Sequence, residues 1–526
     1  MSMPEEKQNE LFTSDRLLAD LLPPGDPMII FSQEIYPAFR DKQFEECYSD
    51  MGRNAISPAF LALVTILQWR ESMSDEEAAD ACIRRLDWKI ALHLPSDWRD
   101  RFHATTLCRY RKRLIENGKM TIIFDRILEL CREKGFIKER SKQRIDATHI
   151  VKHINRIATT DLLFRTVRAL VEEIERKEPD FYQEHISDDI KERYGKPFSS
   201  FGYSKERRAD KQLELIEDGF QLRAMVHRYG IQNLDQLTIM ETVFSENVVI
   251  HEKEINGKTF LEIEEISAPK QTIFDPKDTE LKLGVKGKTK WVGSKCHVIE
   301  TAEENQTNFI TGMIRQQANE NDIKILPRLE EQNAEQNLNP EKIFADGNYI
   351  SGNAIKKFEE KGQKLMGYIQ GDTSAKEETF RLQKFEIDSR NRTAVCPVGK
   401  RSVRSTIHPN GDASIYFGRM DCSRCDFFSS CVGSAKQGFR RLHVVADYEY
   451  VARRRREQAT KAFRKEMKTR ARIEGTISEL VRFYGLRKIK YKGRKGRDLQ
   501  VLLSAAALNV KRLLCSITAS SQTCVG

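Results

Sequence analysis

Short apolar runs alternate with capping residues over residues 51–140, and this pattern predicts a helical domain. Ser57 and Pro58 place a capping hydroxyl before a proline at the first helical position, and a dense apolar run follows them. Ser74 and Glu77 have the spacing of a capping box, which predicts that a second helix begins directly after Ser74.

A third helix is predicted for the basic run LCRYRKRLIENG, which ends at Gly118 and which Thr105 or Thr106 could cap. Three short helices with a basic third member suit a helix-turn-helix-like reader of DNA. A plain helical bundle fits the same pattern equally well, so both interpretations stay open.

Strand-like and helical patterns alternate over the middle of the chain. β-Branched residues gather over residues 141–155, and a long, charged and largely helical stretch follows over residues 155–270. Further strands are expected at residues 259–266 and 291–300, where apolar residues return.

The segment KIFAD predicts a short buried strand that ends in Asp346, and Ser351 can cap the helix after the Asp346-Gly347 turn. A polar helix before this strand, over residues 319–331, would be kinked or interrupted by Pro327. Another strand, KLMGYI, follows the capped helix.

Strand-like pieces fill residues 372–445, one long helix is expected over residues 450–484, and a last helix over residues 499–514. This order of elements predicts an α/β core with insertions, preceded by an all-α domain. The expected boundaries are a leader over 1–50, the helical domain over 51–140, a core over 141–515 with insertions at about 155–270 and 372–445, and a tail over 516–526.

The chain shows neither a secretion signal nor a membrane span in its hydropathy pattern. Its first ten residues are acidic and polar, and the apolar runs at residues 58–69 and 499–510 are too short to cross a bilayer. Hydrophobic residues make up 39% of the chain, which is enough for a folded core. We therefore expect a cytoplasmic protein that does not bind a membrane.

Basic residues are concentrated near the end of the chain. Residues 436–497 hold 21 Lys and Arg against 6 Asp and Glu, a net charge of +15, whereas the whole chain carries +10. The remainder is therefore acidic, and the basic segment indicates a surface for a polyanion such as nucleic acid. A solvated helical face explains the charge about equally well.

Three carboxylates stand where local patterns disfavour or expose them. Glu474 lies on the predicted core-facing stripe of the long helix, where a carboxylate needs a partner or a cation. An ion pair with Arg470, one turn earlier, would satisfy that need. Asp346 ends a buried strand at an edge typical of ligand sites, although Asp-Gly is also common in turns, and Asp146 interrupts a β-branched run.

Phosphoryl transfer with two divalent ions is a chemistry that uses three carboxylates. Their hard oxygens suit Mg²⁺ or Mn²⁺, and two such ions can activate a water or a 3′-hydroxyl and stabilise the leaving oxygen. Carboxylates that converge without a cation would repel one another and raise each other's pKa.

Four of the eleven cysteines, Cys396, Cys422, Cys425 and Cys431, form the pattern C-x25-C-x2-C-x5-C. Four thiolates complete a tetrahedron, so this pattern predicts a structural Zn²⁺ site and not a catalytic one. Reduced surface thiols are the alternative. The other seven cysteines are spaced singly and are expected to be reduced and mostly buried.

Over about residues 30–515 the chain resembles bacterial insertion-sequence transposases of the DDE type, in the subgroup with a separate helical N-terminal domain. The resemblance rests on GRNAISPAFLALVTILQW, MSDEEAADACIRRLDWKIALHL, RIDATHI, DPKDTELKLGVKGKTKWVGSKCHV, FADGNYIS and RARIEGTISELVRFYGLRKIKYKG. It implies an RNase H-like core with Asp146 on the first strand, Asp346 just after the fourth and Glu474 on a late helix. It also implies a cysteine-bearing, zinc-binding insertion before that helix.

The resemblance implies that the chain acts on double-stranded DNA, binding terminal inverted repeats and target DNA as a dimer or larger assembly. The family's arginine matches Arg470, whereas a tyrosine and a lysine of related groups are Met467 and Val481 here. Basic stretches flank Glu474 and could track phosphates while Tyr491 stacks on a base. The candidate DNA contacts are Arg470, Arg482, Lys488, Lys490, Tyr491, Lys492 and Arg494.

The leading hypothesis is an active transposase that hydrolyses a strand at each element end and transfers the freed 3′-hydroxyl to target DNA. A catalytically inactive DNA-binding relative and a metal-dependent nuclease without strand transfer are the two alternatives.

Overall fold

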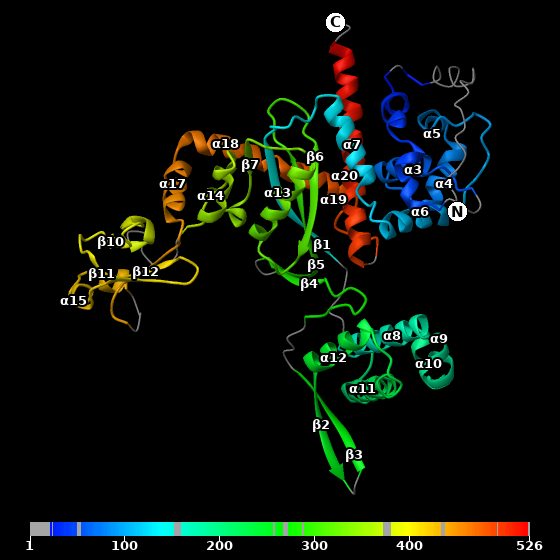
Figure 1. The fold of residues 1–526 in the computed structure, drawn as a ribbon, viewed down its shortest axis with the longest axis horizontal. Coiled ribbons are helices and arrows are strands. Elements are labelled where there is room, and N and C mark those ends of the chain that lie inside the picture. Colours follow the sequence, from blue (N-terminus) through cyan, green and yellow to red (C-terminus); the bar gives the residue numbers. More distant parts are fainter. Residues whose placement is uncertain are drawn as a thin grey trace.

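A central sheet flanked by helices forms the middle of the molecule in the computed structural model (Figure 1). An N-terminal group of helices lies beside the sheet, and two smaller units extend away from it. The residues that the structure describes are 22–23, 25–49, 54–151, 159–255, 258–266, 272–286, 289–371, 380–432, 437–491 and 493–523.

The central sheet has the order β4-β5-β1-β7-β8, and β6 also pairs with β5. Strands β1, β7 and β8 are parallel, whereas β5 runs antiparallel to β1, and β4 and β6 run antiparallel to β5. The fold is therefore mixed α/β, as predicted. The bounds are β1 Gln143–Val151, β4 Lys282–Lys286, β5 Thr289–Thr301, β6 Ile310–Gln317, β7 Lys342–Phe344 and β8 Lys364–Met366.

Successive side chains of β1 alternate between the two faces of the sheet. Ile145, with Ile299 of β5, belongs to an apolar cluster that includes α13 and α14. Arg144 and Asp146 instead bond to side chains and backbone of the C-terminal helices on the opposite face. The bounds are α13 Leu326–Glu335, α14 Gly352–Glu360, α18 Lys461–Ala471, α19 Ile473–Phe483 and α20 Gly493–Thr523.

Pro327 lies in the first turn of α13, which begins at Leu326. A proline is tolerated there because the first N–H groups of a helix have no intrahelical partner. The prediction of helical structure around residues 319–331 is therefore confirmed in part, by η4 (Asp322–Ile325) and α13, whereas the expected kink or interruption of a helix by Pro327 is wrong.

The single long helix expected over residues 450–484 is also wrong, because three helices occupy this stretch: α17 (Tyr448–Gln458), α18 and α19. Thr460 caps α18 by accepting a hydrogen bond of 3.2 Å from the backbone of Phe463. The second break falls at Arg472, between α18 and α19. No glycine or proline marks either break, so the apolar period alone predicts one continuous helix.

The N-terminal helices begin where their capping residues predict. Ser57 accepts a hydrogen bond from the backbone of Phe60, and Ser74 and Glu77 form both halves of the capping box. Neither threonine caps α6, whose N-cap position is Ala104. The bounds are α3 Pro58–Arg70, α4 Asp75–Arg84, α5 Leu86–Ala91, α6 Thr105–Glu116 and α7 Ile122–Glu133.

One hydrophobic core joins these helices to α20. It extends from Phe31 and Phe44, through Leu67 of α3, to Leu508 and Leu513 of α20. Residues 27–47 form short helices within this core, and α20 continues to Thr523. The short helices are α2 Pro27–Ile30, η1 Phe31–Ile35, η2 Tyr36–Ala38 and η3 Asp41–Cys47.

By its length and composition alone, helix α20 is long and apolar enough over Gly493–Ala519 to cross a membrane. However, 72% of its most apolar window is buried inside the structure, as in the core helix of a folded domain. The burial agrees with the prediction of a buried helix here.

The first smaller unit lies between β1 and β4, is helical as predicted, and has its own core around Leu163, Leu215 and Phe244. Its last part is a hairpin of β2 (Val248–Ile255) and β3 (Lys258–Glu265), of which the pattern predicted only the second strand. The helices are α8 Thr159–Lys177, α9 Pro179–His185, α10 Asp188–Gly195, α11 Lys205–Arg228 and α12 Asp235–Asn247.

The second smaller unit, the cysteine-rich unit, follows β8 and has a core around Phe385, Ile415 and Leu442. It is built of short strands, as predicted, with two short helices that carry cysteines. The elements are η7 Leu382–Lys384, β9 Glu386–Asp388, β10 Thr393–Val395, β11 Ser402–Ile407, β12 Ala413–Phe417, α15 Arg419–Ser423, α16 Phe428–Cys431 and β13 Arg441–Val444.

Candidate active site

Two aspartates lie side by side at one edge of the sheet. β1 and β7 are parallel, with Gln143 opposite Ile343 and Arg144 opposite Phe344. Asp146 and Asp346 each follow the last of these pairs by two residues, Asp146 within β1 and Asp346 just after the end of β7. Their proximity is also electrostatic, because the charge of Asp346 contributes to a raised pKa of the Asp146 carboxyl.

The two carboxylates have different surroundings. Asp146 is half-buried, and it accepts hydrogen bonds from the backbone of Ala147 at 2.8 Å and from Arg470 at 2.9 Å. Burial is the main reason that its pKa is raised, and the bonds oppose that effect. Asp346 is exposed and accepts a 2.7 Å bond from the backbone of Gly347 at the start of η5 (Gly347–Tyr349).

Glu474 lies in the first turn of α19, and its side chain is 67% exposed. The prediction that it faces the core is wrong, because the break at Arg472 shifts the helical stripe on which that prediction rested. The exposed carboxylate needs no buried partner, so the argument from desolvation does not apply to Glu474.

Arg470 joins two of the acids. One guanidinium nitrogen lies 2.9 Å from the Asp146 carboxylate and the other lies 3.4 Å from Glu474. The ion pair weighed from the sequence as an alternative partner for Glu474 is therefore present. It does not separate Glu474 from the aspartates, because the same guanidinium holds both Asp146 and Glu474.

The donor set around this edge consists of three carboxylates, whose hard oxygens suit Mg²⁺ or Mn²⁺. Among the described residues, no three or more His, Cys, Asp or Glu side chains are arranged to hold a metal ion. Arg470 supplies the positive charge between Asp146 and Glu474 in the structure. The acids therefore suit a divalent cation by the chemistry of their oxygens, whereas in this structure a guanidinium supplies the counter-charge.

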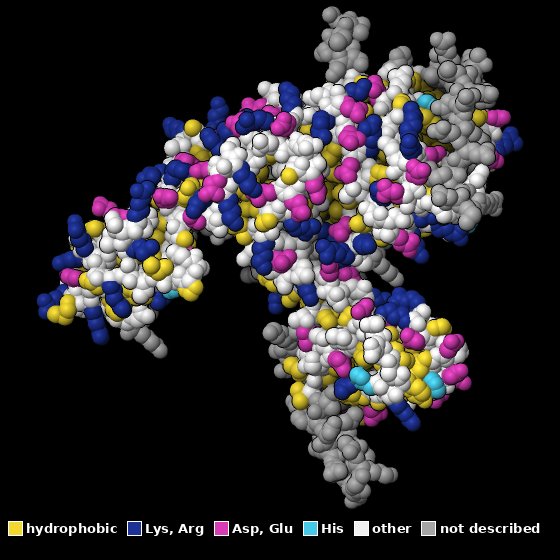
Figure 2. Space-filling view, viewed as in Figure 1, with side chains coloured by type: hydrophobic (Ala, Val, Ile, Leu, Met, Phe, Trp, Pro, Cys, Tyr) yellow, Lys and Arg dark blue, Asp and Glu magenta, His cyan; other side chains and the backbone are white. Residues whose placement is uncertain are grey.

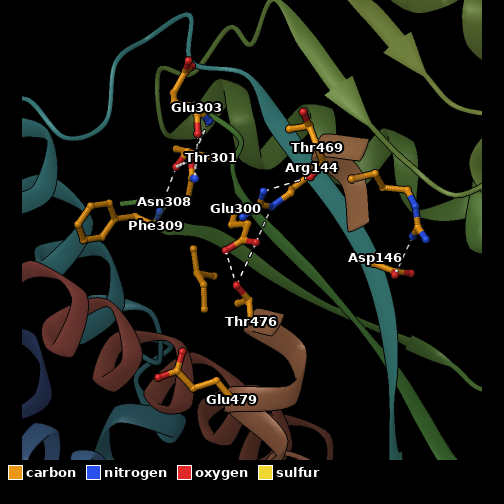
Figure 3. A network of polar contacts seen from close by, with 12 residues as sticks. Arg144, Asp146, Glu300, Thr301, Glu303, Asn308, Phe309, Thr469, Thr476 and Glu479 are labelled. Atoms are coloured by element: carbon orange, nitrogen blue, oxygen red, sulfur yellow. Dashed lines mark hydrogen bonds and ion pairs between the residues drawn. The ribbon is translucent and has the colours of Figure 1, made fainter. Parts of the chain in front are cut away.

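A buried carboxylate, Glu300 of β5, connects the two parts of this site (Figure 3). It is fully buried, and it accepts bonds of 2.7 Å from Arg144, 2.8 Å from Thr476 and 2.9 Å from Arg512. Arg144 also donates to the backbone carbonyl of Thr469 at 3.1 Å. The network ties β1 to α18, α19 and α20.

The network includes a residue close in sequence to Asp146 and another close to Glu474. Arg144 precedes Asp146 by two residues on the same face of β1, and Thr476 follows Glu474 by two residues on α19. Sequence reasoning missed Glu300, although a signal was present. A glutamate at the end of the apolar run CHVIE is as unfavourable in a buried strand as Asp146 is in its β-branched run.

The opposite face of the sheet supports the turn that carries Asp346. The Tyr349 hydroxyl bonds to His297 of β5 at 2.6 Å, and His297 bonds to Gln316 at 2.8 Å. Burial lowers the pKa of His297 to about 4, so the imidazole is neutral near pH 7. This neutral chain of hydrogen bonds anchors the Asp346 turn to β5 and β6.

The four clustered cysteines line one small cavity of about 30 Å³ in the cysteine-rich unit. Backbone N–H groups donate to two of the sulfurs, from Lys400 to Cys396 at 3.3 Å and from Arg440 to Cys422 at 3.4 Å. Burial raises the pKa of Cys431 to about 11. The cysteines are thus gathered in one place, although the described side chains do not reach the spacing of metal ligands.

Among the single cysteines, Cys47, Cys82, Cys131 and Cys296 are buried, as expected, whereas Cys108 and Cys515 are exposed. None of these six forms a disulfide. Cys524 lies outside the described residues.

Two of the candidate DNA contacts, the half-buried Tyr491 and the exposed Lys490, also contact the N-terminal helices. The Tyr491 ring lies 6.3 Å from that of Trp69 and 5.4 Å from the guanidinium of Arg111, and the Lys490 amine lies 4.2 Å from the Trp69 ring. Burial raises the pKa of Tyr491 and lowers that of Lys490. This arrangement does not favour the expected stacking of Tyr491 on a base, because its ring packs against Trp69 of α3 and Arg111 of α6.

The other candidate contacts differ in accessibility. Arg482 and Lys488 are exposed, and Lys488 lies beside the end of β1, where it bridges to Val151. Arg494 is exposed but pairs with Glu280 at 3.0 Å. Lys492 lies outside the described residues.

Two protein families match parts of the chain. Residues 16–113 match the family described as Transposase domain (DUF772), and residues 395–514 match the family described as Transposase DDE domain. The second match includes the four clustered cysteines and Glu474, whereas Asp146 and Asp346 lie outside both matches. Neither a curated protein nor a solved structure matches the chain.

Replacement of Asp146 by Asn should stabilise the cation-free protein near pH 7. The raised pKa means that folding disfavours the ionised carboxylate, so this cost appears as the pH rises through the raised pKa and is absent in acid. Thermal unfolding of Asp146→Asn and wild type should therefore coincide at low pH and separate at neutral pH. Exposed Asp210 provides the control, and Asp210→Asn should show no such divergence.

Replacement of Glu300 by Gln should destabilise the protein by about 3–5 kcal/mol, because the buried guanidinium of Arg144 and the half-buried guanidinium of Arg512 lose a fully buried counter-charge. Denaturant unfolding measures this change. Glu479→Gln on α19 is the control, since it removes a partly exposed carboxylate that pairs with Lys511 and, at 3.8 Å, with Arg512, and it should cost about 1 kcal/mol or less. Equal losses in the two variants would contradict the central role of Glu300.

Proposed function

The two matched domains indicate an insertion-sequence transposase of the DDE type, and from this premise we propose that the chain cuts and rejoins DNA strands with Asp146, Asp346 and Glu474. The observation that supports the proposal is the pairing of β1 with β7, because Asp146 and Asp346 each follow its last pair by two residues and their charges interact. Glu474 joins them through Arg470.

The order of the sheet supports an RNase H-like core. With the short β4 set aside, the strands in chain order are β1, β5, β6, β7 and β8, and they lie in the order β6-β5-β1-β7-β8. Asp146 then lies on the first strand and Asp346 follows the fourth, as the family resemblance implies. The late helix α19 supplies Glu474 from the face on which Asp146 lies.

In the proposed reaction, the chain's residues position a phosphodiester at the edge of the sheet. Two Mg²⁺ or Mn²⁺ ions, held by Asp146, Asp346 and Glu474, would activate the attacking water or 3′-hydroxyl and stabilise the leaving oxygen. Arg470 compensates the charge of Asp146 and Glu474 before a cation binds, and Glu300 fixes α19 against β1.

The same proposal extends to the partners. The N-terminal helical domain would bind the terminal inverted repeats, and exposed Arg482 of α19 and exposed Lys488, which lies beside the end of β1, would contact DNA. Two or more copies of the chain would act on paired ends. α6 keeps Arg109 and Lys112 exposed for such a contact, while its Arg111 is buried against Asp75 of α4.

A structural Zn²⁺ in the cysteine-rich unit forms a second part of the proposal. Four thiols around one cavity, two of them accepting backbone N–H bonds, suit a tetrahedral site of thiolates. Bound zinc would hold its ligands as thiolates and link α15 and α16 to the turn at Cys396. The ion would stabilise the unit without taking part in strand transfer.

Strand joining tests the catalytic proposal. Purified protein with Mg²⁺ should join DNA ends, taken from the sequence that flanks its gene, to a plasmid. Asp146→Asn, Asp346→Asn and Glu474→Gln should each lower joining by about two orders of magnitude or more, the scale on which loss of one charge-stabilising group acts. Glu479→Gln on the same helix should join at close to the wild-type rate.

The products distinguish the alternatives. Wild-type joining undiminished in Glu474→Gln would reject the assignment of that residue. Hydrolysed ends without joined strands would identify a nuclease, and binding without cleavage in Mg²⁺ or Mn²⁺ would identify an inactive DNA-binding relative.

Elemental analysis tests the zinc proposal. The wild-type chain should contain about one zinc per molecule. Cys425→Ser should lose most of it and make residues 380–444 sensitive to protease. Cys515→Ser, which changes an exposed single cysteine, should retain the metal. Folded wild-type protein that is purified without chelator, contains no zinc and takes up none when zinc is added would contradict the proposal.

A further inference from the structure

A groove of about 670 Å³ lies between α17 and the beginning of the cysteine-rich unit. Its walls come from the segment after β8, from η7 and β9, and from one face of α17. Lysine and arginine side chains are frequent on the arm that carries these elements (Figure 2). The polar side chains that line the groove include Lys384, Glu386, Arg455 and Arg456.

The charge of this groove is unbalanced. Three cationic side chains face one carboxylate, Glu386, among the lining residues. One guanidinium nitrogen of Arg455, Nη1, is buried and has no hydrogen-bond partner within the described part of the chain. A buried donor without an acceptor costs about 1–3 kcal/mol, so an acceptor that enters the groove would stabilise Arg455 relative to its surroundings among the described residues.

Arg455 also lines a neighbouring groove of about 410 Å³, whose two carboxylates are already engaged. Asp447 pairs with Lys356 at 3.3 Å, and Asp412 pairs with His443 at 3.1 Å. Neither carboxylate forms an ion pair with Arg455 among the described residues.

The run of four arginines in α17 divides into two pairs. Arg453 pairs with Glu359 and Glu457, and Arg454 is buried, bonds to Glu457 at 2.8 Å and donates to the carbonyl of Gly367. Arg455 and Arg456 take part in none of the ion pairs found between described residues. The internal pair thus fixes the helix, and the second pair faces the groove.

A backbone segment connects the groove to the turn that carries Asp346. Gln370 donates a 2.9 Å bond to Asn348, which is two residues beyond Asp346. The carbonyl of Tyr368 lies so close to Gly347 that a side chain there would approach it to 2.9 Å. The segment of residues 368–371 therefore passes from the turn of Asp346 directly into the wall of the groove.

We propose that this groove binds the phosphate backbone of the DNA that enters the active site, with Arg455 and Arg456 as the phosphate-binding side chains. The inference rests on the proposed function and adds a place where DNA is held. A guanidinium offers paired donors that match phosphate oxygens, and the phosphate supplies the acceptor that Arg455 lacks. Interactions of this kind position DNA without reading its sequence.

Salt-dependent binding of random-sequence duplex DNA to the full-length, metal-free chain tests the inference. The slope of the logarithm of affinity against the logarithm of salt should become shallower by about 0.9 for each phosphate that a variant no longer neutralises. Arg456→Gln changes an exposed residue and should flatten the slope by about one such step, and the double variant with Arg455→Gln by about two. Glu386→Gln should bind DNA more tightly than wild type.

Arg453→Gln is the matched control, because it removes an arginine from the same helix that already pairs within the chain, and its slope should stay at the wild-type value. Slopes of the double variant and of Arg456→Gln equal to this control would overturn the groove assignment. If wild-type protein still joined DNA ends in that case, only the groove assignment would be rejected and the proposed function would remain supported. Failure of wild type to bind DNA at all would reject both.

Discussion

The carboxylate of Glu300 is the interaction on which the rest of the structure depends. It is fully buried in the middle of the sheet, and its bonds to Arg144, Thr476 and Arg512 join β1 to α19 and α20. A buried charge is tolerated only when partners replace the water it has lost, so these elements can meet in only one arrangement. That arrangement brings Asp146 close to the helix that carries Glu474.

In the candidate site, unlike the network around Glu300, carboxylates outnumber the cationic groups that compensate them. Asp146 is half-buried with a raised pKa, next to a second aspartate, and a single guanidinium, Arg470, compensates it and Glu474. Converging carboxylates cost stability unless a cation joins them, and sites of this kind are where function imposes such a cost. The bonds of the buried Glu300 network offset this cost in stability.

Local patterns predicted much of the fold. The capping residues Ser57 and Ser74 predicted where helices begin, and the strand of Asp146 was recognised from its β-branched run. The single helix over residues 450–484 was wrong because its breaks have no glycine or proline signal. The burial of Glu474 failed with it, since a helical stripe that crosses an unseen break no longer faces one side.

The sequence by itself determined the types of element, the acidic residues worth attention and the clustered cysteines, because these follow from spacing and from local propensity. Only the tertiary structure decided that the charge of Asp346 acts on Asp146, that Glu300 links β1 to the C-terminal helices, and that Tyr491 packs against Trp69. These interactions join segments far apart in the chain. Their free energy depends on burial and on charges contributed by other elements, and no local pattern contains that information.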